Sequence, residues 1–373
     1  MNEYILMHRN DQVAKVNIGE SGIEIDKIIK PNLMPFGVVE TEKKSLNDQL
    51  TDWNGNRCIP FGRPNYKQLA EQYNIKRASD WIAKSYMCSL TDCYWFKPKY
   101  SLRKWKDVNF RDNGFSSNLY KHLFYGKNNE PINDFNSPDI TTDGAEPKMW
   151  VEQEDDFYLL KHYSESTPRT VCNEYMVSKL FAQMGIDCVN YDIIWANEKL
   201  CCISKCFIES NDEEFVAARD LMNEYGCSMK NIGQLMSEFG FEKEFNEMVI
   251  GDYLSGNSDR HSGNFGVIID SKTQKIKRFA PLFDHGEAYI YENMDRLTYI
   301  VGETTFGKAI ENVDEKYLNI VNNIDKNDVA NILDSVPYID LDTKDEIYNE
   351  FLRRIDHVHD LIIEKEIDYD REF

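Results

Sequence analysis

The chain has 373 residues and is strongly acidic, with 43 Lys and Arg against 64 Asp and Glu and a net charge of −21. Its 42% hydrophobic and 29% charged residues are typical of a globular protein and exclude wholesale disorder. The length predicts two domains or a two-lobed domain. Because an acidic chain repels phosphate backbones and anionic lipids, we expect neither direct nucleic-acid binding by this chain alone nor membrane binding.

Two sequence features bear on the cell compartment. The first residues, Met1-Asn-Glu-Tyr-Ile-Leu6, lack the basic and apolar parts of a signal peptide, and no run of 18 apolar residues occurs. The nine cysteines have spacings, such as that of Cys88 and Cys93, that fit no zinc template, so we expect reduced and buried thiols. Both features favour a cytoplasmic protein.

The N-terminal third, residues 1–130, shows an α+β pattern whose role the sequence does not reveal. Short apolar runs at residues 4–8, 13–18 and 22–29 predict strands, and residues 66–86 have helical spacing that is interrupted near Asn74. A polar, turn-rich segment then predicts a domain boundary before residue 136.

A strand, a tight loop and a second strand are expected over residues 139–151. Gly144 allows backbone amides to turn toward an anion, and Lys148 adds a positive charge nearby. The next apolar strand contains Lys161, and a lysine among buried neighbours requires a partner. The spacing predicts a helix over 169–184, ended by Gly185, that places Glu174 beside its buried face, where it can pair with Lys161.

Strands are then expected at 189–195 and 200–208, followed by helices at 215–224, 232–239 and 241–254. The last helix leads into Gly256-Asn-Ser-Asp-Arg-His-Ser-Gly-Asn-Phe-Gly266, in which Asp259 and Asn264 are five residues apart. An apolar strand, a turn and a strand at 280–283 lead to a second acid, Asp284.

This hairpin resembles the active site of kinases, where a catalytic-loop Asp accepts a hydroxyl proton while an Asn and a second Asp bind metal. A metal hydrolase is the alternative, with Asp259, His261, Asp284 and His285 as its ligands. That alternative leaves Lys161 and the Gly144 loop without a role, whereas phosphoryl transfer uses all of them.

The motifs resemble those of one family, the HipA-like protein kinases, which include the HipA toxin and the CtkA-type bacterial kinases. The resemblance rests on Asn257-Ser-Asp-Arg-His-Ser-Gly-Asn264 with Ala280-Pro-Leu-Phe-Asp284, and it extends to Thr141-Thr-Asp-Gly-Ala-Glu-Pro-Lys148. It implies an α+β fold with two lobes, related to phosphoinositide kinases. The β-rich small lobe would span residues 136–210 and the helical large lobe residues 211–373, with residues 1–130 as an α+β extension.

The resemblance also implies a serine/threonine protein kinase that uses ATP and Mg²⁺. Asp259 would be the base, Asn264 and Asp284 the metal ligands, and Lys161 a catalytic residue. The expected nucleotide-binding residues, with Glu174 as the partner of Lys161, are Asp143, Gly144, Ala145, Lys148, Lys161, Glu174, Lys205, Phe207, His261 and Asn264.

Regulation and partners follow from the same resemblance. The family implies autophosphorylation in the phosphate loop, at the position of Thr141. It also implies a protein substrate, and a toxin whose partner is a helix-turn-helix antitoxin. Thr298, Thr304 and Thr305, after Asp284, are other candidate modification sites. Two alternatives stay open, a phosphatidylinositol-type lipid kinase and a catalytically silent kinase fold that binds a partner. The acidic stretch 287–311 speaks against a membrane-facing lipid kinase.

Overall fold

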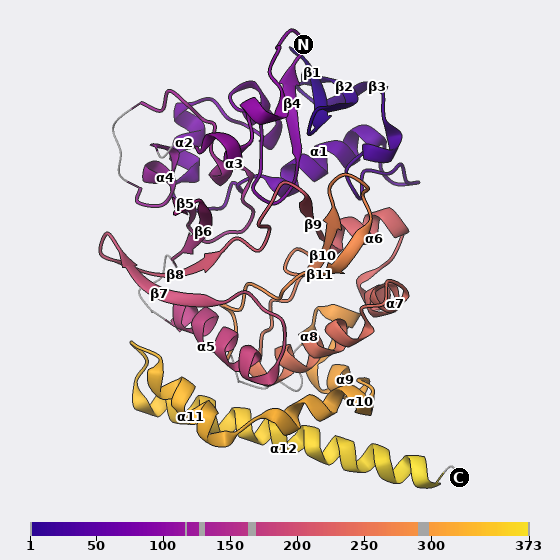
Figure 1. Ribbon diagram of the computed structural model, residues 1–373, viewed down its shortest axis with the longest axis vertical. Coiled ribbons are helices and arrows are strands. Elements are labelled where there is room, and N and C mark those ends of the chain that lie inside the picture. The colour runs from indigo at the N-terminus through magenta and orange to yellow at the C-terminus, as the bar shows by residue number, and fades with distance from the viewer. Residues whose placement is uncertain (1, 116–117, 127–130, 163–168, 290–297, 372–373) are drawn as a thin grey trace. The chain divides into compact units, whose positions relative to one another are not determined.

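The structure is a computed structural model that describes residues 2–115, 118–126, 131–162, 169–289 and 298–371. The chain divides into two compact units (Figure 1). Unit 1 comprises Met1–Ser164, Lys205–Gly226 and Val267–Lys277, and unit 2 comprises Glu165–Ser204, Cys227–Gly266 and Arg278–Phe373. The domain limits expected from the sequence stay a prediction.

Unit 1 begins with an antiparallel sheet in the order β3-β2-β1-β4 (Figure 1). Its strands are β1 (Asn2–His8), β2 (Asp11–Gly19), β3 (Gly22–Ile28) and β4 (Tyr94–Pro98). Helix α1 (Leu46–Arg57) starts at a capping box of Ser45 and Asp48, and its Thr51 hydroxyl accepts a hydrogen bond from the Ile23 N–H of β3. The three strands expected in residues 4–29 are confirmed.

A large apolar core lies under this sheet and joins it to the following helices. Helices α2 (Tyr66–Gln72) and η2 (Ala78–Ala83) are separated near Asn74, which has a positive φ of 55°, and the expected interruption is confirmed. Trp81 is fully buried and donates from its indole nitrogen to the Tyr66 hydroxyl at 3.0 Å. This hydrogen bond satisfies the indole N–H while both aromatic rings are buried.

The remaining elements of unit 1 include the β5–β6 hairpin and the three-stranded sheet β11-β10-β9. They are η1 (Pro31–Leu33), η3 (Trp105–Asp107), α3 (Phe110–Asn113), α4 (Asn118–Leu123), η4 (Pro138–Thr141), β5 (Lys148–Gln153), β6 (Asp156–Lys161), β9 (Glu213–Ala217), α6 (Ala218–Tyr225), β10 (Gly266–Asp270) and β11 (Ile276–Phe279).

Three expectations for these segments are wrong. The strand expected from residue 139 is the 3-10 helix η4, because the Ser137 hydroxyl accepts the Asp139 N–H and caps a helical turn. The helix expected from residue 215 begins only after strand β9, which pairs with β10. The strand expected at 280–283 is absent from these described residues, since β11 ends at Phe279 and Leu282 forms only an isolated bridge with Cys188.

Unit 2 is mainly helical. Its elements are α5 (Arg169–Met184), β7 (Tyr191–Ala196), β8 (Lys199–Lys205), η5 (Met229–Asn231), α7 (Ile232–Glu238), α8 (Glu242–Ser255), β12 (Thr298–Tyr299), η7 (Val301–Glu303), β13 (Thr304–Thr305), α9 (Phe306–Glu311), α10 (Glu315–Leu318), η8 (Asn319–Asn323), α11 (Lys326–Ser335) and α12 (Leu341–Arg371). The helix expected over 169–184 is confirmed, and Gly185, with φ of 80°, follows its last residue. Within the described part of the chain, every helix is too short or too polar to traverse a lipid bilayer.

Candidate active site

The loop that carries Asp259 is closed by its own hydrogen bonds. It leaves helix α8 at Gly256, which has a positive φ of 66°. Asn264 is buried and donates from its side-chain nitrogen to the Asp259 carbonyl at 3.1 Å, and the His261 N–H donates to the same carbonyl at 2.8 Å. Asp259 and His261 are exposed. Because the amide nitrogen of Asn264 is engaged, its amide oxygen is the atom that can bind a metal.

A buried arginine, Arg260, connects this loop to the segment that contains Asp284. The Arg260 guanidinium, fully buried, donates to the Asp252 carboxylate at 2.8 Å, to the Asn264 carbonyl at 3.0 Å and to the Phe283 carbonyl at 2.6 Å. Burial alone would lower the pKa of Arg260, but the Asp252 carboxylate outweighs burial and raises that pKa. One charged group therefore fixes helix α8, the Asn264 loop and the Asp284 segment together.

The same carboxylate receives further donors. The Tyr299 hydroxyl donates to Asp252 at 2.7 Å, and burial together with the nearby Asp252 charge holds the pKa of this phenol well above its ordinary value. The Asn257 side chain donates to Asp252 at 3.3 Å. The Asp252 carboxylate therefore accepts hydrogen bonds from three residues, which connect helix α8 to the Asn257 loop and to Tyr299.

Asp284 has a left-handed backbone with φ of 62°, unusual for a residue other than glycine. Its N–H donates to the Tyr191 hydroxyl of β7 at 3.2 Å. The next amide, of His285, donates to the Glu174 carboxylate at 2.7 Å, and Asn173 donates to the Gly286 carbonyl at 2.9 Å. Helix α5 therefore holds the backbone that follows Asp284, which is how a strained residue persists at this position.

The hydrolase alternative finds no support in this arrangement. The His285 ring lies in the buried network, where its Nδ1 is 3.2 Å from the Arg260 guanidinium. Within the described residues, Asp259, His261, Asp284 and His285 do not form a group whose ligand atoms lie close enough to share a metal ion.

The expected phosphate loop lies in unit 1, between η4 and β5. Gly144 has a positive φ of 99°, and a Cβ added there would lie 2.0 Å from the Lys148 Nζ, which donates to the Asp143 carbonyl at 3.1 Å. The side chain of Lys148 therefore folds over Gly144, and any side chain at position 144 would displace the Lys148 amine. The Gly144 N–H donates to the Asp143 carboxylate at 2.7 Å, and Ala145 follows in the same turn.

The N-terminal region holds this loop in place. Arg63, 2% exposed, donates to the Gly144 carbonyl from Nε at 2.9 Å and to the Asp143 carbonyl at 3.0 Å. The Ile59 N–H donates to the Ile140 carbonyl at 2.8 Å. Burial lowers the pKa of Arg63 to about 10, and the guanidinium still carries its charge at neutral pH. Residues of the first 130 therefore fix the backbone of the loop, as a structural brace would.

Two lysines meet across the hairpin that follows. Lys148 of β5 and Lys161 of β6 are directly opposed in the antiparallel register, and both are buried. Opposed residues project from the same face of the hairpin, so both lysine side chains leave the hairpin on one face, and the Lys148 amine turns toward the Gly144 loop. The expected pairing of Lys161 with Glu174 joins residues of different units and stays a prediction.

Comparisons with known proteins identify the family. The model of the HipA-like C-terminal domain matches residues 140–339, more than half of the chain. The chain belongs to this HipA-like family. No curated protein matches the chain by sequence.

Two solved structures share the fold. The HipA of Shewanella oneidensis MR-1, solved with HipB and its operator DNA, has a TM-score of 0.59 at 13% identity and is matched over 97% of this chain and 98% of its own. The Helicobacter pylori proinflammatory kinase CtkA has a TM-score of 0.51 at 18% identity, over 59% of this chain and 95% of its own. The expected α+β class with antiparallel sheets is confirmed.

The expected hinge of this HipA-like chain follows strand β8. The Lys205 side chain is exposed and pairs with Asp156 at 3.0 Å, and the Asp156 hydrogen bond raises the pKa of Lys205. The Phe207 ring contacts Phe215 edge-on at a centroid distance of 5.4 Å, and the Cys206 N–H donates to the Phe157 carbonyl at 2.8 Å. The Lys205 side chain is engaged in surface ion pairs with Asp156 and Glu209, and the expected role of this segment as a hinge stays a prediction.

Sequence reasoning missed the residues that organise both loops: Arg63, Asp252, Arg260 and Tyr299. Asp252 lies on helix α8, which is buried over most of its surface. Its sequence therefore has no single apolar stripe from which an inward-facing Asp252 could be recognised. An arginine inside the catalytic loop was a usable signal, because a charge between two functional residues requires a partner.

Replacing Gly144 with alanine should weaken nucleotide binding. The positive φ costs alanine about 1 to 2 kcal/mol, which corresponds to roughly tenfold weaker affinity, and the new methyl displaces the Lys148 amine. Titration with a fluorescent ATP analogue measures the change. Gly55→Ala is the control, since Gly55 lies in α1 with no atom within 4 Å of an added Cβ; equal affinities of the two variants would contradict the role of Gly144.

Asp139 makes stability depend on pH. Burial raises the pKa of Asp139 to about 6 from 3.8, against the opposing effects of the Trp150 N–H and the Ser137 hydroxyl. Ionisation therefore opposes folding: the contribution of Asp139 is most favourable below pH 4 and is lost as the pH rises to 6, by about 2 to 3 kcal/mol.

The Asp139→Asn variant carries no charge, its amide oxygen still accepts from the Trp150 N–H, and its amide nitrogen can donate to the Ser137 hydroxyl. It should therefore be more stable than wild type at pH 8 and lose this advantage near pH 4. Urea unfolding at both pH values measures the difference, with Glu42→Gln, an exposed acid, as control. A difference independent of pH would show that Asp139 is not the titrating group.

Proposed function

We propose that this HipA-like chain is an ATP- and Mg²⁺-dependent serine/threonine protein kinase. The observation that carries the proposal is the Arg260 network, which fastens the Asn264 loop and the Asp284 segment to each other through buried, charge-assisted hydrogen bonds. Phosphoryl transfer requires little covalent chemistry from a protein, but it requires metal ligands and a base in fixed positions.

The residues of unit 2 fit a magnesium ion. The Asn264 amide oxygen and the Asp284 carboxylate are hard oxygen ligands of the kind that Mg²⁺ prefers, and the amide is oriented by its hydrogen bond to the Asp259 carbonyl. A bound ion would neutralise charge on the nucleotide phosphates. Asp259, exposed at the surface of the loop, would orient the acceptor hydroxyl and accept its proton.

The residues of unit 1 fit the phosphates of ATP. Lys148 and Lys161 are buried residues at directly opposed positions of the hairpin, and two lysines on one face suit a polyanionic ligand. Asp143, Gly144 and Ala145 form the adjacent turn, and the Gly144 N–H, which donates to the Asp143 carboxylate, would exchange this partner for a phosphate oxygen. The backbone from Lys205 to Phe207 would bind adenine, and His261 would lie near the phosphates.

Autophosphorylation would have to rearrange the phosphate loop. The Thr141 side chain is buried, and its hydroxyl donates to the Cys88 carbonyl at 2.7 Å. A phosphate there would lose this hydrogen bond and lie near the buried Asp139, so it would expel the segment. Thr298, on the exposed edge of β12, requires no such rearrangement and is the more accessible acceptor.

A toxin role with an antitoxin partner follows from the likeness to the Shewanella HipA, which was solved with HipB and operator DNA. The net charge of −21 suits a basic, DNA-binding partner better than direct contact with DNA. Co-purification with the product of a neighbouring helix-turn-helix gene would test this role.

The activity is tested by supplying γ-labelled ATP with Mg²⁺ and, separately, with a chelator. The acceptors are the protein itself, a generic basic protein and phosphatidylinositol vesicles. Mg²⁺-dependent label on serine or threonine is the expected result. Label on the lipid alone would make the chain a lipid kinase, and absence of both label and nucleotide binding would make it a silent kinase fold.

A further inference from the structure

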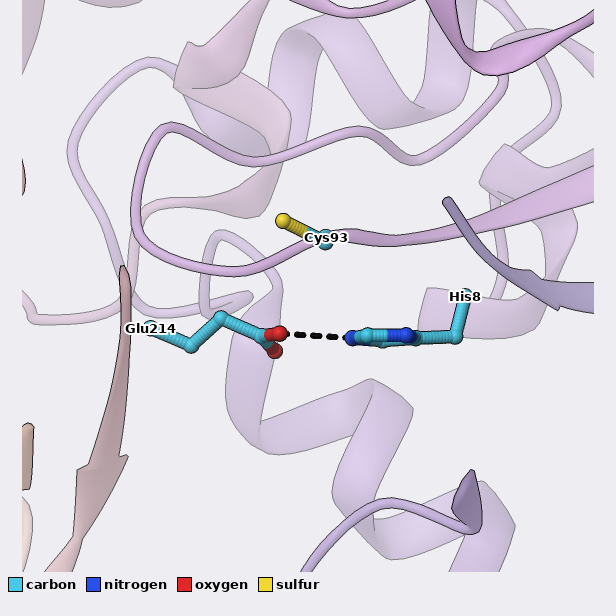
Figure 2. A group of neighbouring side chains, drawn as sticks. All are labelled: His8, Cys93 and Glu214. Carbon is cyan, nitrogen blue, oxygen red and sulfur yellow. Dashed lines mark hydrogen bonds and ion pairs between the residues drawn. The ribbon is translucent and has the colours of Figure 1, made fainter. Parts of the chain in front are cut away.

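Three buried side chains with metal-ligand atoms meet in unit 1, apart from the phosphate loop. The His8 Nε2 lies 2.6 Å from the Glu214 Oε1, and the ligand atoms of His8, Cys93 and Glu214 all lie within 4.8 Å of one another. Figure 2 shows the imidazole aimed at the carboxylate, with the Cys93 sulfur on the same side of both. His8, Cys93 and Glu214 are 2%, 1% and 1% exposed.

The backbone fixes the three segments that carry these side chains. His8 ends strand β1, where it pairs with Tyr94, and the Arg9 N–H donates to the Cys93 carbonyl at 2.9 Å. Glu214 lies in β9, whose Phe215 N–H donates to the Thr91 carbonyl at 2.8 Å. Each candidate ligand therefore lies within two residues of a backbone hydrogen bond that joins its own segment to the segment of another ligand. A metal site requires this kind of preorganisation.

The donor set and its spacing suit zinc. Imidazole nitrogen, thiolate sulfur and carboxylate oxygen are the ligands of tetrahedral Zn²⁺, and bond lengths of about 2.0 to 2.3 Å place ligand atoms roughly 3.3 to 3.8 Å apart. The observed separations, from 2.6 Å to at most 4.8 Å, bracket these values. Small side-chain adjustments would suffice, without movement of a strand.

A cavity borders the cluster on the side of His8, the one candidate ligand that lines it. Its volume is about 500 Å³, and His8 lines it together with Arg9, Asn10, Lys30 and Ser271. The cavity offers an entry path for the ion and a source of water for the fourth ligand position, two features that a metal site needs.

We propose that His8, Cys93 and Glu214 bind one Zn²⁺ ion, with a water from the cavity as fourth ligand. Binding releases the thiol proton of Cys93 to solvent. The proton between the His8 Nε2 and Glu214 moves to the His8 Nδ1, or to solvent if that nitrogen already carries one, so two metal–ligand bonds replace this hydrogen bond. The ion would join the N-terminal sheet, through β1 and the residue before β4, to β9, a strand within the matched family domain. Its role would be structural, stabilising unit 1.

The alternative is a buried His8–Glu214 ion pair beside a cysteine that donates to the Asn211 carbonyl at 3.4 Å. The two hypotheses differ in what wild-type protein binds. Chelator-treated protein is titrated with Zn²⁺ in competition with a chromogenic chelator, and separately with Co²⁺. We expect one Zn²⁺ per chain, a higher melting temperature with Zn²⁺, and the near-ultraviolet charge-transfer band of a cobalt thiolate.

Variants locate the site. Cys93→Ser should remove the cobalt charge-transfer band, whereas Cys88→Ser, which changes another buried cysteine five residues away, should keep it. Glu214→Gln retains a hydrogen-bond acceptor for His8, so it should fold, yet bind Zn²⁺ on the order of 100-fold more weakly. Wild-type protein that binds no Zn²⁺ and gives no cobalt band, or a band that survives in Cys93→Ser, would overturn the proposal.

Discussion

We expect the Asp259→Asn variant to lose phosphoryl transfer while it still binds Mg²⁺ and ATP. The amide cannot accept the proton of the acceptor hydroxyl, and loss of a general base costs about 10² to 10⁴ in rate. The fold should survive because Asp259 is exposed and the substitution leaves in place its backbone carbonyl and N–H, which bond to Asn264 and Asn257.

Single-turnover transfer of labelled phosphate, with nucleotide affinity measured on the same preparation, separates chemistry from binding. Asp360→Asn, an exposed acid of α12, is the matched control and should transfer at the wild-type rate. Full activity in Asp259→Asn would mean that another group accepts the proton.

The Arg260→Met variant should be the least stable single variant of unit 2. Removing the guanidinium leaves the fully buried Asp252 carboxylate without its charge partner, and breaking such a pair costs about 3 to 5 kcal/mol. It also releases the Asn264 and Phe283 carbonyls, so nucleotide-dependent activity should fall together with stability.

Urea unfolding of Arg260→Met and Arg353→Met makes the comparison direct. Arg353 pairs with Glu350 on the surface of α12, half exposed, and such a pair contributes at most about 1 kcal/mol. Replacing Asp252 as well, by asparagine, should recover part of the loss, because no unpaired charge then remains buried. Equal destabilisation by the two arginine substitutions would contradict a central role for Arg260.

The functional loops could be predicted because their signals are local. Asp259 and Asn264 lie within one glycine-bounded segment, and Gly144 lies within another. Helix α5 was predictable from one apolar stripe and a terminal glycine, and it carries Glu174. Local patterns therefore located the candidate loops and helix α5, although the pairing of Glu174 with the His285 amide was not foreseen.

The supports of these loops could not be predicted, because they join residues far apart in sequence. Tyr299 reaches Asp252 across 47 positions, and Arg63 reaches Gly144 across 81. Strand β9 was mistaken for the start of a helix because a short apolar run fits both periods, and its pairing with β10 decides between them. The cysteine spacings excluded a local zinc motif, whereas the fold brings Cys93 to His8 and Glu214.

The most direct measurement is the intact mass of phosphatase-treated protein after incubation with Mg²⁺ and ATP, followed by mapping of the modified residue. Wild type should gain the mass of at least one phosphoryl group on a serine or threonine, and Asp259→Asn should gain none. Wild-type protein that binds ATP but neither gains mass nor phosphorylates a protein acceptor would contradict the assignment of this chain as a protein kinase.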